Sequence, residues 1–373
     1  MNPFKSTSWI VAGTLLLMAA PLRADEPHRT DVFVAGTEGY HTFRIPAIIV
    51  SPRGMLLAFC EGRKNSRSDT GDIDLVLRRS TDNGRTWGAL QVVWDDGPNT
   101  AGNPCPVVDR RTGTIWLPLT RNLGSDKQSE IVAGTSKGTR DVWMTRSTDD
   151  GATWSRPVEI TPQVKDPGWT WFATGPGVGI QLKSGRLVIP CDHSPVGKNT
   201  ELAHVIFSDD GGATWKRGGS TSEGCGEAQL VELGDGSLLM NMRNVARGRH
   251  RRVALSKDGG LTWGETRDEP ALPEPGCQAS LIRYATGGTA TKNRLLFTNP
   301  AGGKREQLTL RFSDDDGATW PAGRVVHAGP AAYSCLSVLA DGAVGVLFEC
   351  GTRNAYERIA FAAVPGEWVS NGR

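Results

Sequence analysis

A pattern of eight residues, Ser-x-Asp-x-Gly-x-Thr-Trp, sets aspartates at a fixed spacing along this 373-residue chain. It occurs five times without a mismatch, and the copies begin at Ser80, Ser147, Ser208, Ser256 and Ser313. Regularly spaced carboxylates occur in calcium loops, so calcium binding is the first chemistry to consider. Aligning Gly317 with the invariant glycine of an EF-hand puts Phe312 and Gly323 at ligand positions, where neither can bind an ion. We therefore interpret these segments, here called Asp-boxes, as structural.

Cysteine is the second residue type with possible metal or redox chemistry. The chain has seven cysteines, with no CxxC pair and no metal-ligand spacing: Cys60, Cys105, Cys191, Cys225, Cys277, Cys335 and Cys350. Some could pair in an oxidising compartment, but an odd number leaves at least one free. For most of them we expect a role as small buried apolar residues.

Each Asp-box is expected to form the turn of a β-hairpin. Ser80 and Asp82 can bond backbone groups across the turn, Gly84 can adopt a positive φ, and Trp87 begins the next strand and packs inward. The segments 74–79 and 203–207, which precede two of the boxes, are rich in β-branched and other apolar residues and predict strands.

The spacing of the boxes indicates a repeat architecture. Successive copies start 67, 61, 48 and 57 residues apart, and periods near 50 residues are typical of propellers and stacked arrays. Short apolar runs punctuated by 46 glycines also favour an all-β chain. We predict a six-bladed β-propeller of four-stranded antiparallel sheets. One blade lacks a box, and we expect the two chain ends to close it, because closure removes exposed edges.

Residues 1–24 are predicted to be a secretory signal peptide. Lys5 precedes an apolar run over 9–20, and Ala24 lies before acidic Asp25 and Glu26. We expect the rest, 25–373, to be one domain in a protein that is periplasmic or secreted. The formal charge is +2, and removing Lys5 and Arg23 leaves it neutral. Composition therefore gives no bulk attraction to nucleic acid or to an anionic membrane.

The five boxes, with Phe43-Arg44-Ile45-Pro46 upstream of the first, resemble those of the bacterial and animal exo-sialidases. The similarity covers nearly the whole of 25–373. An Asp-box alone also occurs in non-catalytic propellers, whereas the combination with Phe-Arg-Ile-Pro is specific. The resemblance implies hydrolysis of terminal sialic acid, a sugar that carries a carboxylate on its anomeric carbon. It implies no metal and no organic cofactor.

The resemblance also implies three arginines for that carboxylate, since a guanidinium binds a carboxylate with two parallel hydrogen bonds. Arg44 matches the first arginine, Arg243 in 239–244 the second, and Arg305 after 299–304 the third. Glu349 matches the family's carboxylate partner of the first arginine.

Sialidases are exceptions among retaining glycosidases because their nucleophile is a tyrosine, which needs a base since its ordinary pKa is near 10. Of the four tyrosines, Tyr333 matches the nucleophile position, and Tyr40, Tyr284 and Tyr356 do not. Glu227 matches the base, with Glu232 as the competing candidate. The family's usual residues before this glutamate are replaced here by 224–226.

Asp69 matches the loop aspartate that protonates the leaving oxygen and then activates water. Arg63 is expected to contact substrate or to support Asp69, and Asn103 matches a segment at the pocket rim. Trp171 and Phe172 either form an apolar wall for the N-acetyl group or pack in the core.

The predicted function is that of an exo-α-sialidase acting with retention on sialylated glycoproteins, glycolipids or oligosaccharides. A trans-sialidase would share all of these residues and differ only in its products. A non-catalytic sialoglycan-binding propeller would lack the tyrosine, the glutamate or the acid, and residues matching all three occur in this chain.

Overall fold

The computed structural model describes residues 1, 27–246, 248–284 and 293–370. Residues 2–24 of the predicted signal peptide lie outside the described residues. Within the described part, no helix is long and apolar enough to cross a membrane.

The regular secondary structure of the described chain is almost all β-strand, with three short helices, which confirms the predicted all-β class. The first sheet has nine strands: β2 (Thr42–Val50), β3 (Leu56–Arg63), β4 (Ile73–Ser80), β5 (Gln91–Trp94), β6 (Thr100–Gly102), β7 (Val107–Val108), β8 (Ile115–Asn122), β9 (Asp141–Ser147) and β10 (Val158–Glu159). The second has five: β11 (Trp169–Thr174), β12 (Ile180–Gln181), β13 (Leu187–Pro195), β14 (Leu202–Ser208) and β15 (Lys216–Ser220).

The third sheet has four strands: β16 (Cys225–Glu232), β17 (Leu238–Asn244), β18 (His250–Ser256) and β19 (Arg267–Pro273). The fourth has seven: β20 (Ser280–Arg283), β21 (Leu295–Pro300), β22 (Glu306–Ser313), β23 (Ala322–Val338), β24 (Val344–Cys350), β25 (Arg358–Val364) and, at its edge, β1 (His28–Val34). Three short helices are α1 (Gln128–Ala133), α2 (Thr161–Val164) and α3 (Gly366–Ser370).

Within each sheet, paired strands run antiparallel except at one place, and two connections join smaller antiparallel groups into larger sheets. The only link between β4 and β6 is a single parallel pair, Ile73 with Thr100. Strand β23 is 17 residues long; its first half pairs with β22 and its second half with β24. The described strands therefore form four separate sheets, with no hydrogen-bonded ladder that closes them into one barrel.

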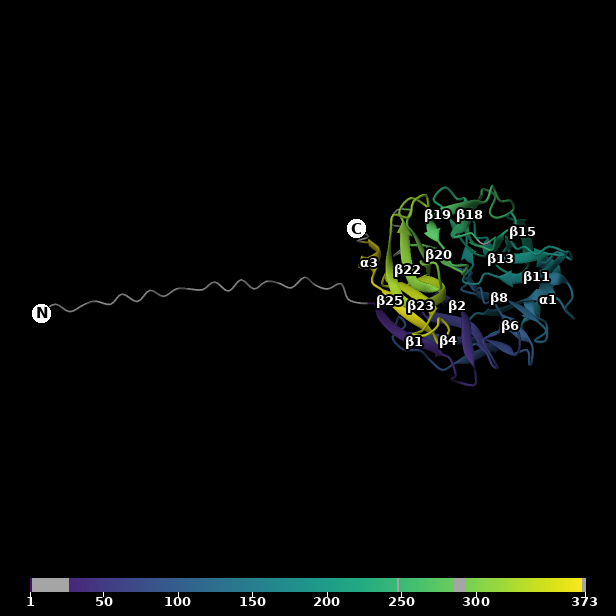
Figure 1. The fold of residues 1–373 in the computed structure, drawn as a ribbon, viewed down its shortest axis with the longest axis horizontal. Coiled ribbons are helices and arrows are strands. Elements are labelled where there is room, and N and C mark those ends of the chain that lie inside the picture. The colour runs from purple at the N-terminus through teal and green to yellow at the C-terminus, as the bar shows by residue number, and fades with distance from the viewer. Residues whose placement is uncertain (2–26, 247, 285–292, 371–373) are drawn as a thin grey trace.

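The first and last strands meet. Strand β1 pairs antiparallel with β25, from His28 opposite Ala363 to Val34 opposite Arg358. Figure 1 shows the chain running round the molecule from β1 through α1 and β15 to β25, so that its purple start lies beside its yellow end.

The Asp-boxes form the expected turns. In the third box, Ser208 Oγ donates to Asp210 Oδ1 at 2.7 Å and accepts from Gly212 N at 2.8 Å. Thr214 donates to both Asp210 oxygens, at 2.9 Å from its backbone nitrogen and 2.6 Å from its hydroxyl. The other four boxes repeat these bonds. Because the box side chains satisfy one another within the turn, they act as local structure.

Each box also packs against a strand of a neighbouring part of the fold, which precedes the box in the chain for four of them and is the last strand, β25, for the first box. A Cβ atom on Gly212 would overlap the ring of Trp116 in β8, so the close approach requires glycine. The same holds for the other box glycines, which pair as Gly84 with Phe361, Gly151 with Leu57, Gly260 with Val205 and Gly317 with Leu239. The turns thereby join neighbouring sheets through apolar contacts as well as through the chain.

All seven cysteines are buried and unpaired, which agrees with the expectation that most of them are small apolar core residues.

Candidate active site

The predicted site residues converge on one cavity of about 250 Å³, although they come from six regions of the chain. Its lining includes eight of the nine: Arg44, Arg63, Asp69, Asn103, Glu227, Arg243, Arg305 and Tyr333. The ninth, Glu349, is fully buried and contacts Arg44 behind the wall. A larger hollow of about 730 Å³ elsewhere is lined mainly by aliphatic side chains, so size alone does not locate the chemistry.

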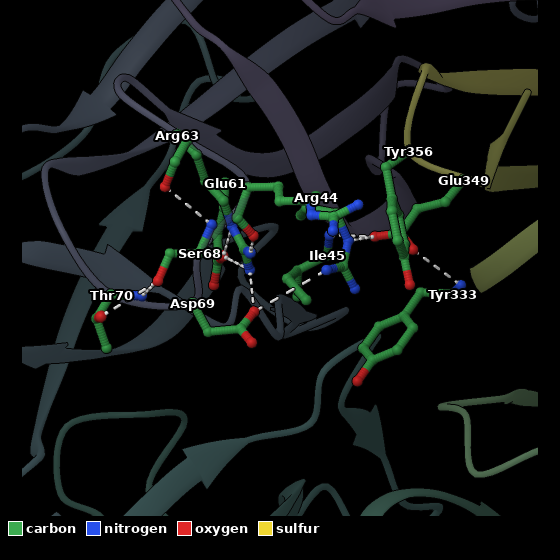
Figure 2. Close-up of polar contacts among 12 residues, drawn as sticks. Arg44, Ile45, Glu61, Arg63, Ser68, Asp69, Thr70, Tyr333, Glu349 and Tyr356 are labelled. Carbon is green, nitrogen blue, oxygen red and sulfur yellow. Dashed lines mark hydrogen bonds and ion pairs between the residues drawn. The ribbon is translucent and has the colours of Figure 1, made fainter. Parts of the chain in front are cut away.

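Arg44 is held by a bulge in β2. The register between β2 and β3 shifts after Arg44, and Ile45 has a φ of 63°, which a β-branched residue rarely adopts. Glu349 holds this conformation, because its Oε1 accepts from Arg44 Nε at 2.6 Å and from Ile45 N at 2.9 Å. Burial lowers the pKa of the Arg44 guanidinium, but the Glu349 carboxylate more than reverses this, so Arg44 stays charged. Figure 2 shows Arg44 between Asp69 on one side and Glu349 on the other.

The other two predicted arginines face the same space. Arg243 Nη1 donates to Glu227 Oε2 at 2.9 Å and to the Tyr333 hydroxyl at 3.2 Å. Arg305 donates to the Tyr356 hydroxyl at 2.8 Å and to the carbonyl of Gly276 at 2.9 Å. The cavity wall therefore carries three guanidinium groups.

A buried ion pair underlies two of these arginines. Arg251 and Glu274 are both fully buried and bond at 2.5 Å. Glu274 accepts from the backbone of Asn244, which follows Arg243, and Arg251 donates to the carbonyl of Cys277, which follows Gly276. The pair thus fixes backbone beside both Arg243 and the carbonyl that holds Arg305.

Tyr333 and Glu227 form a short polar contact in the cavity wall. The Tyr333 hydroxyl donates to Glu227 Oε1 at 2.5 Å, and the Tyr333 backbone nitrogen donates to Glu349 Oε2 at 3.1 Å. Burial, reinforced by the Glu227 charge, raises the pKa of Tyr333 well above 10, so the side chain is a neutral phenol. The competing Glu232 lies elsewhere, since its carboxylate accepts from Lys183 N and lines the aliphatic hollow.

Asp69 lies at the mouth of the cavity, and its side chain is 61% exposed. Arg63 Nη2 is 2.7 Å from Asp69 Oδ1, and Arg44 Nη1 is 3.9 Å from the same oxygen. Desolvation raises the pKa of Asp69. The charges of Arg63 and, after it, Arg44 lower that pKa by more, so the net shift is downward. Figure 2 shows Arg63 held between Glu61 and Asp69, so that it supports the loop aspartate.

Asn103 lines the wall but does not offer its side-chain oxygen to the cavity. That oxygen accepts from Arg140 Nη2 at 2.5 Å and from Thr120 at 3.4 Å. The Asn103 backbone nitrogen donates to Glu61 Oε1 at 3.0 Å. Asn103 therefore ties the Glu61–Arg63 pair to Arg140.

Sequence reasoning missed four charged residues of the wall: Glu61, Arg140, Asp192 and Glu201. Asp192 lies 1% exposed within the apolar strand β13, and its Oδ2 has no hydrogen-bond partner. Burial, followed by repulsion from Glu201 and Glu227, raises the pKa of Asp192. A carboxylate directly after the apolar run 187–191 was the available signal, because buried acids are rare unless paired.

The two aromatic candidates, Trp171 and Phe172, lie in different surroundings. Trp171 lines the cavity, with the Arg140 guanidinium 4.0 Å from its ring centre. Phe172 points the other way and is fully buried in a hydrophobic cluster.

Within the described residues, three carboxylates gather at one place outside the cavity, namely Asp72, Asp74 and Asp95. Lys64 Nζ lies 2.9 to 3.4 Å from all three, so a side-chain cation already lies among them. This group offers no argument for a bound metal.

Comparisons with known proteins identify a family. A family model described as a BNR repeat-like domain matches residues 54–346. A protein named sialidase from Micromonospora viridifaciens is 39% identical over 90% of this chain and 54% of its own length. An exo-alpha-sialidase from Aspergillus fumigatus is 35% identical over 90% of this chain and 86% of its own.

A solved structure also matches closely. The Hadza microbial sialidase Hz136 superposes with a TM-score of 0.81 at 34% identity, covering 90% of this chain and 68% of that one. The chain spans about half the length of the Micromonospora relative, 54%.

Proposed function

The chain belongs to the family of sialidases with BNR repeats, and on that premise we propose that it is an exo-α-sialidase, which releases terminal sialic acid from glycans. The observation that carries the proposal is the Tyr333–Glu227 contact of 2.5 Å in a wall with three arginines. A phenol beside a carboxylate, facing a carboxylate-binding wall, fits a substrate whose reacting carbon bears an anion.

Arg44, Arg243 and Arg305 bind the sialic acid carboxylate. Glu349 and Glu227 lie beside Arg44 and Arg243, which reduces repulsion among the cations before substrate arrives. The carboxylate then fixes the anomeric carbon close to Tyr333, and this positioning is the first contribution to catalysis.

Tyr333 is the nucleophile and Glu227 its base. The phenolic oxygen bonds to the anomeric carbon as its proton passes to Glu227, and the bond to the glycosidic oxygen breaks. A neutral phenol avoids the repulsion that a carboxylate nucleophile would meet beside the substrate anion. A second displacement by water restores the phenol, and two inversions give net retention.

Asp69 is the general acid and then the base. Its exposed position at the mouth, next to Arg63, supports this role, because the leaving glycan must extend out of the cavity. It gives a proton to the departing oxygen and later takes one from the water that releases sialic acid. Arg63 and Asn103 position this side of the cavity, as their contacts with Glu61 support.

The strands suit a six-bladed propeller of four-stranded sheets. Dividing the nine-stranded sheet at the single β4–β6 pair, and the seven-stranded sheet within β23, gives blades based on β2–β5, β6–β10, β11–β15, β16–β19, β20–β23 and β23–β25 with β1. In each of the first five blades a box lies before the outermost strand and contacts the preceding blade, and the first box contacts Phe361 in β25. These contacts support a closed ring.

We propose export of the protein through residues 1–24 to the periplasm or the medium, with 25–373 as one catalytic domain. Its substrates are sialylated glycoproteins, glycolipids or oligosaccharides, in line with the names of the relatives.

The test is release of free sialic acid from a fluorogenic α-sialoside by wild type, Tyr333→Phe and Asp69→Ala. We expect turnover by wild type and a loss of about 10²-fold or more in Tyr333→Phe. Asp69→Ala should lose less on this substrate, since its leaving group needs little protonation. Product analysis in the presence of acceptor sugars distinguishes hydrolysis from transfer. Sialoside binding without any release would support a non-catalytic propeller and refute the proposal.

A further inference from the structure

The catalytic cavity opens into a second hollow. The cavity of about 250 Å³ is small beside the roughly 300–1,000 Å³ usual for ligand pockets. The neighbouring hollow measures about 1010 Å³ and lies between α1 and the segment 194–201. Gln128, Glu201 and Val245 line both, so the two spaces meet at these side chains.

The hollow lies away from the exit of the leaving glycan. Asp69, which marks that exit, contacts Arg63 and Arg44. Glu201 lies against the segment that carries Glu227, because its carbonyl accepts from Gly224 N and Cys225 N and a Cβ atom on Gly226 would overlap its carboxylate. A group that enters the hollow therefore belongs to the sialic acid itself and not to the glycan it leaves.

The two remaining arms of the sugar are its N-acyl group and its polyol tail. Trp171 and Ala173 form one apolar stretch of the wall, and the Arg140 guanidinium lies over the Trp171 ring. Trp171 is buried and packs with Ile131 and Ala173 in an apolar cluster, so an N-acetyl group suits this wall. The polyol tail then points to Gln128 and Glu201, which line both spaces.

The lining of the hollow suits an uncharged group. Ser129, Ser194, Asn199 and Thr200 supply hydroxyl and amide groups. Among the described residues that line the hollow, the one cation is Lys198, and its ammonium bonds to Glu223. A second carboxylate would find no unpaired cation on this lining.

Resting on the proposed sialidase function, we propose that this hollow is a subsite for acyl substituents on the polyol tail. The enzyme then accepts sialic acids that are acylated at the tail, while the wall at Trp171 rejects enlargement of the N-acyl group. The bonds made and broken are those of the unsubstituted reaction.

The test compares three fluorogenic α-sialosides: the plain N-acetyl compound, one with a benzamide at the terminal tail carbon, and one with N-benzoyl in place of N-acetyl. We expect wild type to hydrolyse the tail benzamide within about threefold of the plain compound in kcat/KM, and the N-benzoyl compound at least about 30-fold more slowly. Equal loss on both enlarged compounds, or greater loss on the tail benzamide, would overturn the proposal.

Ser129→Trp fills the hollow outside the catalytic cavity. We expect the kcat/KM ratio of tail benzamide to plain compound to fall about tenfold or more. Ser337→Trp, which lines the separate aliphatic hollow, is the matched control and should leave that ratio unchanged. An unchanged ratio in Ser129→Trp contradicts the subsite. Calorimetric binding of the corresponding free sugars gives the same comparison without turnover, so absence of hydrolysis of the plain compound would refute only the sialidase proposal.

Discussion

At the scale of single residues, Glu349 controls more of the site than its buried position suggests. One carboxylate oxygen bonds Arg44 and Ile45, and the other bonds the backbone of Tyr333. A single side chain therefore fixes the first substrate-binding arginine and the nucleophile relative to each other.

Glu349→Gln should damage both binding and stability. An amide nitrogen would face one of these donors in place of an accepting oxygen. The buried Arg44 would also lose its counter-charge, and removing one partner of a buried ion pair costs about 3–5 kcal/mol of stability. We expect KM for a sialoside to rise about tenfold or more, with a lower melting temperature. Glu232→Gln, the competing glutamate by sequence, is the control and should leave KM unchanged. An unaltered KM in Glu349→Gln would contradict this account.

The lowered pKa of Asp69 predicts two different pH profiles. In the free site, Arg63 and Arg44 keep the pKa of Asp69 below its usual value, so the acid form is lost as pH rises through that lowered pKa. When a substrate carboxylate pairs with Arg44, part of this effect is cancelled and the pKa rises. Since kcat/KM reports the free enzyme and kcat the complex, the alkaline limb of kcat should lie at higher pH than that of kcat/KM.

The measurement uses a sialyl-oligosaccharide, whose leaving group needs protonation. Asp69→Asn should remove the limb from both profiles. Coincident limbs in wild type would show that substrate does not change the proton affinity of Asp69.

The sequence analysis predicted the site residues that lie in recognisable motifs. It missed residues that belong to the cavity wall only because the fold brings them there. Arg44, Tyr333 and Asp69 lie in patterns that can be read locally. Arg140 and Glu201 have no such pattern, because their importance arises when separate strands bring them to one wall. Glu61 lies within the buried strand β3, where a charge was a readable but unused signal.

At the scale of elements, the Asp-box is a turn whose side chains replace water as partners for the backbone. Bonds from Thr214, by side chain and then backbone, lower the pKa of Asp210 to about 2. A carboxyl whose pKa is lowered by folding stabilises the fold above the unfolded pKa near 4, and this contribution is lost as pH falls towards 2.

Asp210→Ala therefore tests the element directly. It removes bonds from Ser208 and Thr214, and we expect a loss of about 1–2 kcal/mol in the free energy of unfolding at pH 7. Asp209→Ala, its neighbour in the same turn, removes an exposed ion pair with Arg186 and should cost at most about 1 kcal/mol. Denaturant unfolding at pH 7 and pH 3 measures both, and the difference between the variants should shrink at the lower pH. A larger cost for Asp209→Ala would contradict the structural role of the box.

The boxes made the strands before them predictable, because the pattern marks where each strand ends. The segments 74–79 and 203–207 lie within β4 and β14 as predicted. The bulge at Ile45 was not predictable, since a positive φ at a β-branched residue opposes local preference and depends on Glu349, 304 residues away. Such local conflicts are expected at functional sites.

At the scale of the whole molecule, the pairing of β1 with β25 joins the two ends of the described fold. Strand β1 buries Val32 and Phe33, and the Phe33 ring lies 5.3 Å from that of Phe43, the neighbour of Arg44. The chain start is thereby coupled to the wall of the active site.

Removing β1 tests this coupling, by comparing a chain that starts at Thr37 with one that starts at His28. Loss of two buried apolar side chains costs about 3–6 kcal/mol before the ladder bonds are counted. In a protein larger than 250 residues, where about 1 kcal/mol shifts the melting temperature by 2–4 °C or less, we expect a drop of about 10 °C. Because Phe43 loses its ring contact beside Arg44, KM for a sialoside should rise at temperatures where the shortened chain is still folded. If β1 only covers the edge of its sheet, the melting temperature will fall while KM stays constant. That result would refute the link between the β1–β25 pairing and the arginines that bind the substrate carboxylate.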